Sequence, residues 1–190
     1  MSKIFFTSDT HFCHDREFVY KVRGFPSIDA MNEAIVERWN AVVGPEDTVY
    51  HLGDVMLNDN EKGMELLRRL NGHIYIIRGN HDTDTRVKLY VNEGMKVLNS
   101  VIPYAEVIKY GKFTFYLSHY PTLTSNLDND APLSQHVLNL YGHTHQTKNF
   151  YNDTPFMYHV GMDSHDCTPV SAEQVIEDIK REVEVCKAQL

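Results

Sequence analysis

Five short polar clusters interrupt the chain, and each follows a run of apolar residues directly. They are rich in Asp, His and Asn: Ser8-Asp9-Thr10-His11, Gly53-Asp54, Gly79-Asn80-His81-Asp82, His119, and Gly142-His143-Thr144-His145. Short apolar runs predict buried strands, and in open α/β sheets the loops after the carboxyl ends of strands hold the site. The spacing therefore predicts strand ends that converge on one edge and bring the polar clusters together.

The runs before the clusters predict five strands, over Lys3 to Ser8, Thr48 to Leu52, His73 to Ile77, Phe113 to Ser118 and Leu138 to Tyr141. Two more strands are expected, at Tyr104 to Lys109, which forms a hairpin with the fourth strand through Tyr110-Gly111-Lys112, and at Met157 to Val160. Amphipathic spacing predicts helices from Ser27 or Asp29 to about Val42, Glu61 to Leu70, Thr83 to Asn92, and from about Ala172, where Ser171 and Gln174 match a capping box.

The first half thus has the order β-α-β-α-β, and the second half is rich in strands and ends in a helix. This order predicts an α/β layered sandwich with mixed sheets. The length, 190 residues, suits one domain over residues 1–190.

The composition restricts the classes of function that the chain could have. The net charge is −8 and there is no Lys/Arg stripe, which argues against an extended nucleic-acid groove. No segment is apolar and long enough to span a bilayer, and the first apolar run suits a buried strand better than a signal peptide. The three cysteines match neither a disulfide framework nor a zinc knuckle. We therefore expect a cytoplasmic protein; the sequence defines no oligomeric state.

Histidine is the outlier, with eleven residues, several of them clustered beside Asp, Asn and Gly. Asp and His with one Asn suit Mn²⁺, Fe or Zn²⁺ better than Ca²⁺ or a thiolate site. In Asp9-Thr10-His11 and His143-Thr144-His145, residues two apart point the same way if extended. Seven ligands are too many for one tetrahedral ion and suit two ions that share a carboxylate.

The ordered series Asp-x-His, Gly-Asp, Gly-Asn-His-Asp, a lone His and Gly-His-x-His resembles the signature of calcineurin-like metallophosphoesterases. All five blocks occur in order between residues 9 and 145. The short chain and the opening Asp9-Thr10-His11-Phe12 are similar to the small bacterial and phage members that have no cap domain. The resemblance implies a four-layer α-β-β-α sandwich with two mixed β-sheets.

The resemblance also implies roles. One divalent metal ion would be held by Asp9, His11 and His145, a second by Asn80, His119 and His143, and Asp54 would bridge them. His81 would be the catalytic general acid, and Asp82 is expected to orient it. Mn²⁺ is the expected ion, with Fe, Zn²⁺ or Ni²⁺ as alternatives.

The implied activity is metal-dependent hydrolysis of a small phosphorylated substrate by water activated between two ions. A phosphodiester is preferred over a monoester because a site without a cap can accept a second ester group. The alternative is a metal-binding scaffold of the same fold that has lost catalysis. The complete set of ligands, together with His81, favours the enzyme.

Other residues have two open interpretations. His14 and Arg78 could contact the substrate phosphate or be structural or exposed residues, and Cys13 could be a soft ligand or a small packing residue. Asp163, His165 and Asp166 are expected to border the site without a fixed role. We interpret the remaining histidines beside apolar runs as structural: His51, His73, His136 and His159. The long loop from Thr122 to Leu133 suggests a lid or rim.

Overall fold

Two neighbouring residues of the first strand show how the layers form. In β1 (Ile4–Thr7), Phe5 and Phe6 are both buried, although successive side chains of a strand face opposite ways. Phe5 joins a core with Trp39, whereas Phe6 packs edge-on against Phe115, with ring centroids 5.4 Å apart. This sheet is therefore covered on both faces. The computed structural model describes residues 2–98, 105–125, 130–152 and 154–188.

The first sheet has the strand order β10-β1-β2-β3-β4. Strands β1 to β4 run parallel, and β10 pairs with β1 antiparallel. The new strands are β2 (Thr48–His51), β3 (His73–Ile77), β4 (Lys96–Leu98) and β10 (Val170–Ser171). Parallel pairing places the carboxyl ends of β1, β2 and β3 at one edge.

The second sheet has the order β5-β6-β7-β9-β8. Its inner strands β6, β7 and β9 are parallel, and β5 and β8 pair antiparallel at the two edges. Its strands are β5 (Ala105–Tyr110), β6 (Phe113–Ser118), β7 (Val137–Tyr141), β8 (Phe150–Tyr151) and β9 (Thr154–His159). The expected hairpin is β5–β6, and both sheets are mixed, as the sequence predicts.

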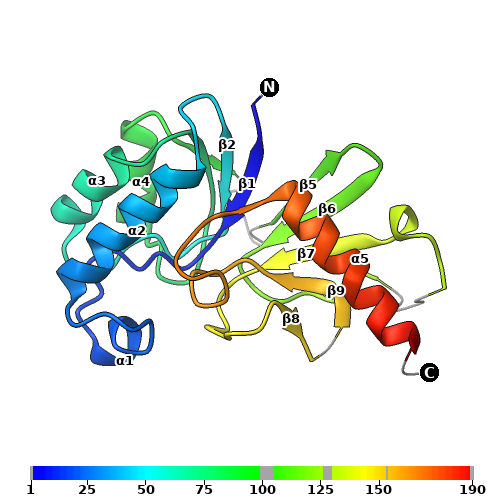
Figure 1. Ribbon diagram of the computed structural model, residues 1–190. Coiled ribbons are helices and arrows are strands. Elements are labelled where there is room, and N and C mark those ends of the chain that lie inside the picture. Colours follow the sequence, from blue (N-terminus) through cyan, green and yellow to red (C-terminus); the bar gives the residue numbers. More distant parts are fainter. Residues whose placement is uncertain (1, 99–104, 126–129, 153, 189–190) are drawn as a thin grey trace.

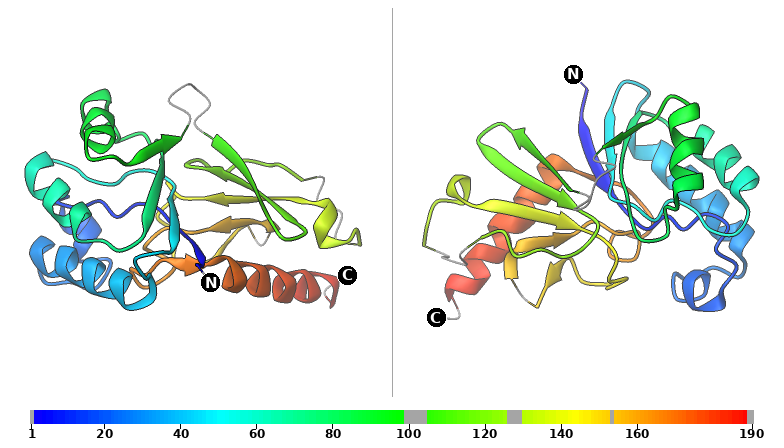
Figure 2. Two further views of the ribbon diagram at one scale, coloured as in Figure 1. Left: turned by 90° about the horizontal axis from the view of Figure 1, so that it is seen from above. Right: turned by 180° about the vertical axis from the view of Figure 1, so that it is seen from behind.

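Helices form the two outer layers (Figures 1 and 2). They are α1 (Glu17–Tyr20), α2 (Ile28–Val42), α3 (Asn60–Arg68), α4 (Asp84–Asn92) and α5 (Ala172–Ala188), with a 3₁₀ turn at Leu133–Gln135. Helices α2, α3 and α4 pack on the first sheet, and α5 packs on the second, where Tyr158 donates a 2.7 Å hydrogen bond to Asp178. Ser27 accepts from Ala30 N and Ser171 from Gln174 N, as N-cap residues do, while the side-chain amide of Gln174 donates to Asp178.

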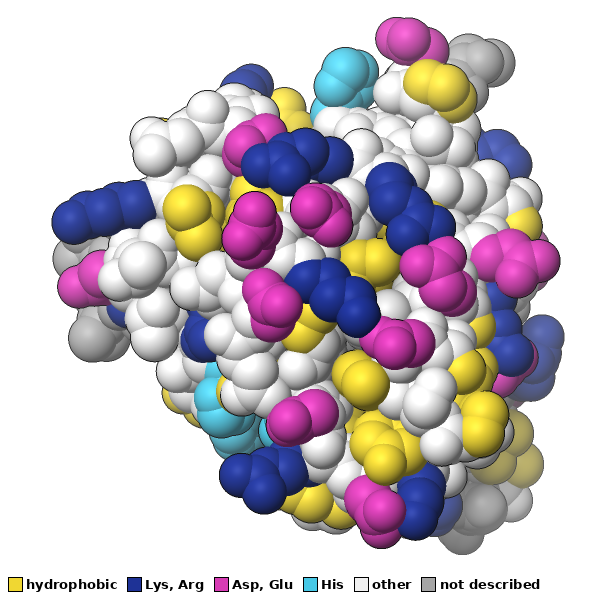
Figure 3. Space-filling view, turned by 90° about the vertical axis from the view of Figure 1, so that its left-hand side faces the viewer, with side chains coloured by type: hydrophobic (Ala, Val, Ile, Leu, Met, Phe, Trp, Pro, Cys, Tyr) yellow, Lys and Arg dark blue, Asp and Glu magenta, His cyan; other side chains and the backbone are white. Residues whose placement is uncertain are grey.

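The helical face carries both signs of charge. Figure 3 shows Lys and Arg side chains interspersed with Asp and Glu, and ion pairs join Arg68 to Glu93 and Arg69 to Glu33. No helix in the described part of the chain has the length and apolar character needed to cross a membrane.

Candidate metal centre

The five polar clusters lie together where the carboxyl ends of strands from both sheets meet. Backbone hydrogen bonds tie their loops to one another: Asp9 N donates to Gly53 O at 2.9 Å, His11 N to Asp54 O at 3.1 Å, and Gly142 N to His119 O at 3.0 Å. The predicted convergence of strand ends is therefore present in the structure.

Three side chains form what we call the first ligand group: Asp9, His11 and His145. Their ligand atoms all lie within 4.8 Å of one another. His11 Nε2 is 3.1 Å from His145 Nε2 and 3.7 Å from Asp9 Oδ1. The group joins the loop after β1 to the loop after β7, and it contains the three residues that the resemblance implies for one ion.

The second ligand group consists of Asn80, His119 and His143. Asn80 Oδ1 lies 2.9 Å from His119 Nε2 and 2.9 Å from His143 Nδ1. Asp54 stands between the two groups, because its Oδ2 is 3.4 Å from His119 Nε2 and 3.7 Å from His11 Nε2. Ligand atoms of Asp9, Asp54 and His119 also lie within 4.8 Å of one another. Asp9 is therefore close to the second group as well, although the resemblance assigns it to the first.

A buried polar atom without a partner tests whether a cation fits. Asp9 is fully buried, and its Oδ2 accepts from Ser8 Oγ at 2.6 Å and His143 N at 2.9 Å. Its Oδ1 has no hydrogen-bond partner among the described residues. An unpaired carboxylate oxygen in a protein interior is costly. Because Oδ1 faces the nitrogens of the first ligand group, a divalent ion there would satisfy it.

The tautomers of two histidines also fit ion binding. Nδ1 of His119 donates to Leu52 O at 2.7 Å, and Nδ1 of His145 donates to Asp163 Oδ2 at 2.9 Å. Once its Nε2 is deprotonated, each ring presents the lone pair of that nitrogen to its ligand group. Burial lowers the pKa of His119, but the carboxylates of Asp54 and Asp9 raise it to about 9, so an ion at Nε2 would displace a proton.

Backbone strain concentrates at the same place. Five of the seven candidate ligands have positive φ, between 48° and 67°: Asp9, His11, Asp54, His143 and His145. Holding a residue other than glycine in this region costs of order 1–3 kcal/mol, and such residues cluster at functional sites. Gly79 and Gly142 add close contacts, because a Cβ atom would collide with Asp54 at the first position and with Ser8 and Asp9 at the second.

Asp82 has a different role from the expected one. Its Oδ2 accepts from the backbone N of Asp54 at 2.8 Å and of Gly79 at 2.9 Å, and its Oδ1 accepts from Val55 N and from Tyr90 OH. The carboxylate therefore fixes the two loops that carry Asp54 and Asn80 and does not orient His81.

His81 faces the open side of the centre. Its backbone N donates to Asp54 Oδ1 at 2.8 Å, its ring Nε2 is 4.0 Å from Asp54 Oδ2, and its side chain is 43% exposed. It lines a cavity of about 460 Å³ together with ligands of both groups and with His14. Burial, aided by His11 and His81, lowers the pKa of His14 to about 4.

Arg78 does not line this cavity. Its Nε donates to Asp82 O at 2.6 Å, and its guanidinium lies 2.7 Å from the carboxylate of Asp84. The expectation that Arg78 contacts substrate therefore finds no support, because the guanidinium is engaged by the start of α4.

Arg23 and Asp163 are the functional residues that sequence reasoning missed or left without a role. The buried guanidinium of Arg23 binds both oxygens of Asp163 at 2.9 Å and donates to Asp9 O at 2.8 Å. Burial raises the pKa of Asp163, but His145 and Arg23 hold it well below its ordinary range. No local motif marks this ion pair, because its partners are 140 positions apart.

Of the four histidines that the sequence predicts to be structural, three are buried, His51, His136 and His159, and His73 is exposed at the start of β3. His165, which is expected to border the site, does not line the cavity and donates to His159 O at 2.8 Å. Asp166 pairs with Arg38 at the surface. The expected lid from Thr122 to Leu133 includes residues 126–129, which lie outside the described residues.

Cys13, which the sequence leaves between a soft ligand and a packing residue, belongs to neither ligand group. It is buried in the first core, where its Sγ lies 4.0 Å from Asn32 Nδ2. Cys167 is also buried, and Cys186 is partly exposed.

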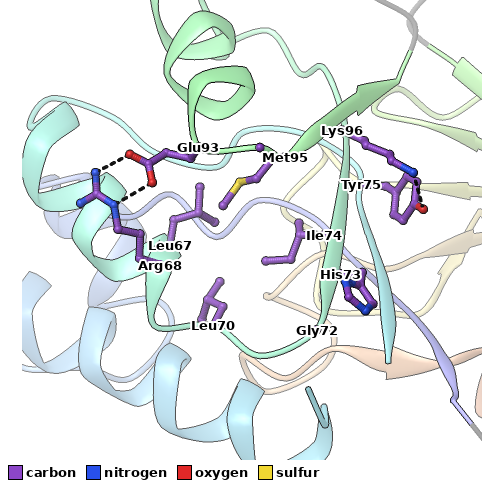
Figure 4. A pocket seen from close by; sticks show the side chains of 11 residues that line it. Leu67, Arg68, Leu70, Gly72, His73, Ile74, Tyr75, Glu93, Met95 and Lys96 are labelled. Atoms are coloured by element: carbon purple, nitrogen blue, oxygen red, sulfur yellow. Dashed lines mark hydrogen bonds and ion pairs between the residues drawn. The ribbon is translucent and has the colours of Figure 1, made fainter. Parts of the chain in front are cut away.

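A separate cavity of about 390 Å³ lies between β3, β4 and the ends of α3 and α4. Figure 4 shows its apolar floor at Leu67 and Ile74 and the Arg68–Glu93 ion pair on its rim. It is lined by His73 and Lys96, the first residues of the parallel strands β3 and β4. The amino-terminal ends of those strands are the edge opposite the metal ligands, and the cavity contains none of them.

The two layered mixed sheets, with candidate ligand groups at their joined carboxyl edge, agree with the fold that the sequence resemblance implies. Residues 2–182 match the model of the calcineurin-like phosphoesterase superfamily domain, and the chain belongs to that superfamily of phosphoester hydrolases.

Individual relatives span nearly the whole chain. It is 33% identical to an uncharacterized protein of Methanocaldococcus jannaschii, over 95% of this chain and 93% of the relative. It is 26% identical to the gene 66 protein of Mycobacterium phage D29, over 95% and 98%. The crystal structure of a protein of unknown function from Aquifex aeolicus has the same fold, with a TM-score of 0.68, 24% identity and coverage of 93% and 99%.

Proposed function

We propose that this protein hydrolyses phosphodiesters at two divalent ions, one in each ligand group, with Asp54 shared between them. The observation that carries the proposal is the position of Asp54 Oδ2, 3.7 Å from His11 Nε2 and 3.4 Å from His119 Nε2. One carboxylate oxygen thus lies within reach of both groups. The unpaired Oδ1 of Asp9 supports occupation by cations.

When bound, the two ions would act as Lewis acids and lower the pKa of coordinated water. The side chains supply the rest. Asp163 orients His145, Leu52 O orients His119, and Asp82 fixes the loops of Asp54 and Asn80. We assign to His81 the donation of a proton to the leaving oxygen, since it faces the cavity and is not in either ligand group.

The charge of the cavity favours a diester over a monoester. None of the residues that line the cavity, all of them in the described part of the chain, is Lys or Arg. Arg23 lies behind Asp163, which neutralises it, and Arg78 is engaged by Asp84. Substrate charge must then be balanced mainly by the ions, and a diester carries one negative charge where an ionised monoester carries two.

For the ions we propose Mn²⁺, with Fe, Zn²⁺ or Ni²⁺ as alternatives. The donors are nitrogen and oxygen without a thiolate, which suits borderline and harder divalent ions. Analysis of the metals in protein purified without added metal tests this assignment.

The activity is tested with bis-p-nitrophenyl phosphate and p-nitrophenyl phosphate, using protein loaded with Mn²⁺ and its metal content measured. We expect metal-dependent hydrolysis of both, with a higher kcat/KM for the diester. A higher value for the monoester would overturn the preference. If protein that holds two ions hydrolysed neither compound, the proposed hydrolase activity would be overturned. The alternative of an inactive metal-binding scaffold would then remain.

A further inference from the structure

One wall of the metal cavity is apolar and comes from the segment around α1. Phe18 lies in α1, and Val22 follows it four positions later; each is 70% exposed. Both line the same cavity of about 460 Å³ as the ligands His11 and Asn80. We call this pair the apolar wall.

The ring of His14 separates Phe18 of the apolar wall from the candidate ligand His11. The ring of Phe18 meets that of His14 almost perpendicularly, at 86°, with centroids 5.6 Å apart. His14 in turn lies 5.2 Å from His11 and 6.5 Å from His81. A substrate whose phosphoryl group is bound at the ligand groups would therefore meet the apolar wall just beyond the His14 ring.

The residues next to Phe18 and Val22 in the sequence hold the apolar wall in place. Val19, between its two members in the sequence, is buried in the core of the first sheet. Arg23, directly after Val22, is fixed by Asp163 and by the carbonyl oxygen of Asp9. The segment is therefore anchored to the metal centre itself, while Phe18 and Val22 stay exposed to the cavity.

A polar centre beside an exposed apolar surface is the usual composition of a small-molecule site, and the volume lies within the ~300–1,000 Å³ typical of such sites. An aromatic ligand group can stack on the face or edge of Phe18 and cover Val22. The cavity offers no Lys or Arg, among the residues that line it, to bind a second charged group there.

We infer that Phe18 and Val22 form a subsite for a planar aromatic group attached to the phosphoryl group, so that the substrates are phosphodiesters with an aromatic ester group and not dialkyl esters. This inference rests on the proposed function, because it places the phosphoryl group at the two ligand groups.

The test measures binding, not turnover. Calorimetry on the protein loaded with Mn²⁺ compares phenylphosphonate with methylphosphonate, at a pH at which both are dianions. These probes share the phosphoryl group and differ only in the organic group. We expect phenylphosphonate to bind roughly ten-fold more tightly. Phe18→Ala should remove most of that preference and leave the Kd of methylphosphonate unchanged.

Val22→Ala should reduce the preference less than Phe18→Ala does, because it removes a smaller surface. Val91→Ala is the matched control, since Val91 is 53% exposed on α4 and does not line the cavity. Equal binding of the two probes, or an undiminished preference in Phe18→Ala, would overturn the subsite. Selective binding without hydrolysis of any diester would keep the subsite and overturn the proposed function.

Discussion

Nδ1 of His145 donates a 2.9 Å hydrogen bond to Oδ2 of Asp163, and Arg23 donates to both oxygens of the same carboxylate. Nε2 of His145 thereby faces His11 at 3.1 Å. A carboxylate that fixes the tautomer of a histidine ligand also raises its basicity. Asp163 is accordingly a positioning residue for the first ligand group.

Asp163→Asn should weaken metal binding about 10–100-fold, as the loss of such a partner typically does. The amide keeps the shape but offers one acceptor oxygen to both His145 and Arg23. Calorimetric titration of the metal-free protein with Mn²⁺ measures the effect. Asp166→Asn is the control, because Asp166 pairs with Arg38 at the surface. Equal affinities in the two variants would contradict the assignment.

Asp54→Ala should lose both ions and the activity, because one carboxylate oxygen serves both ligand groups. The metal content per chain, measured by plasma mass spectrometry, should fall below that of a variant lacking a ligand of one group, such as His143→Ala. A variant that retains full activity would rule out the shared role of Asp54.

His81→Ala should keep its metal and lower kcat about 10²–10⁴-fold, the usual contribution of a positioned proton donor. His73→Ala is the control, because His73 is exposed at the start of β3, and it should change neither the metal content nor kcat. Loss of metal from His81→Ala would make His81 a ligand, and an unchanged kcat would exclude it as the acid.

Gly142→Ala should lower both stability and metal content. A Cβ atom there collides with the side chains of Ser8 and Asp9, and overpacking of a buried site typically costs about 1–3 kcal/mol. Thermal unfolding and metal analysis measure the two effects. Gly111→Ala, where a Cβ meets nothing within 4 Å, should keep its metal. An unaffected metal site in Gly142→Ala would show that the contact relaxes without cost.

The thiols give a test of burial. Burial raises the pKa of Cys13 and of Cys167 to about 11, so only about 0.1% of each is thiolate at pH 8. Cys186 is partly exposed on α5. In Ellman's assay at pH 8, one thiol per folded chain should react quickly and all three after unfolding in guanidinium. Fast reaction of three thiols in the folded chain would contradict the packing of both buried cysteines.

Much of this structure follows from the sequence because its signals are local. Apolar runs mark the strands, Ser27 and Thr83 cap helices, and the polar clusters lie at strand ends whose parallel pairing brings them together. The fold class and the grouping of the seven candidate ligands could be predicted from these signals.

The features that could not be predicted from the sequence are short elements or depend on contacts that a local pattern does not show. Strands β8 and β10 have two residues each, too few for a periodic pattern, and exist through pairing with β9 and β1. Helix α1 has no side-chain hydrogen bond at its N-cap, Arg16, within the part of the chain that the structure describes. Asp82 adjoins His81 in sequence, yet its oxygens bind backbone N–H groups, which adjacency does not reveal.

The two ligand groups share a further property, which concerns when the protein could acquire its metal. Each group takes at least one histidine from the loops after β6 or β7, so neither is complete within residues 2–98. During synthesis, the nascent chain could hold neither complete group until the segment that carries His143 and His145 has left the ribosome. Metal loading would then be a late step, because it would follow the synthesis of β1 to β7, and bound ions would link loops of the two sheets.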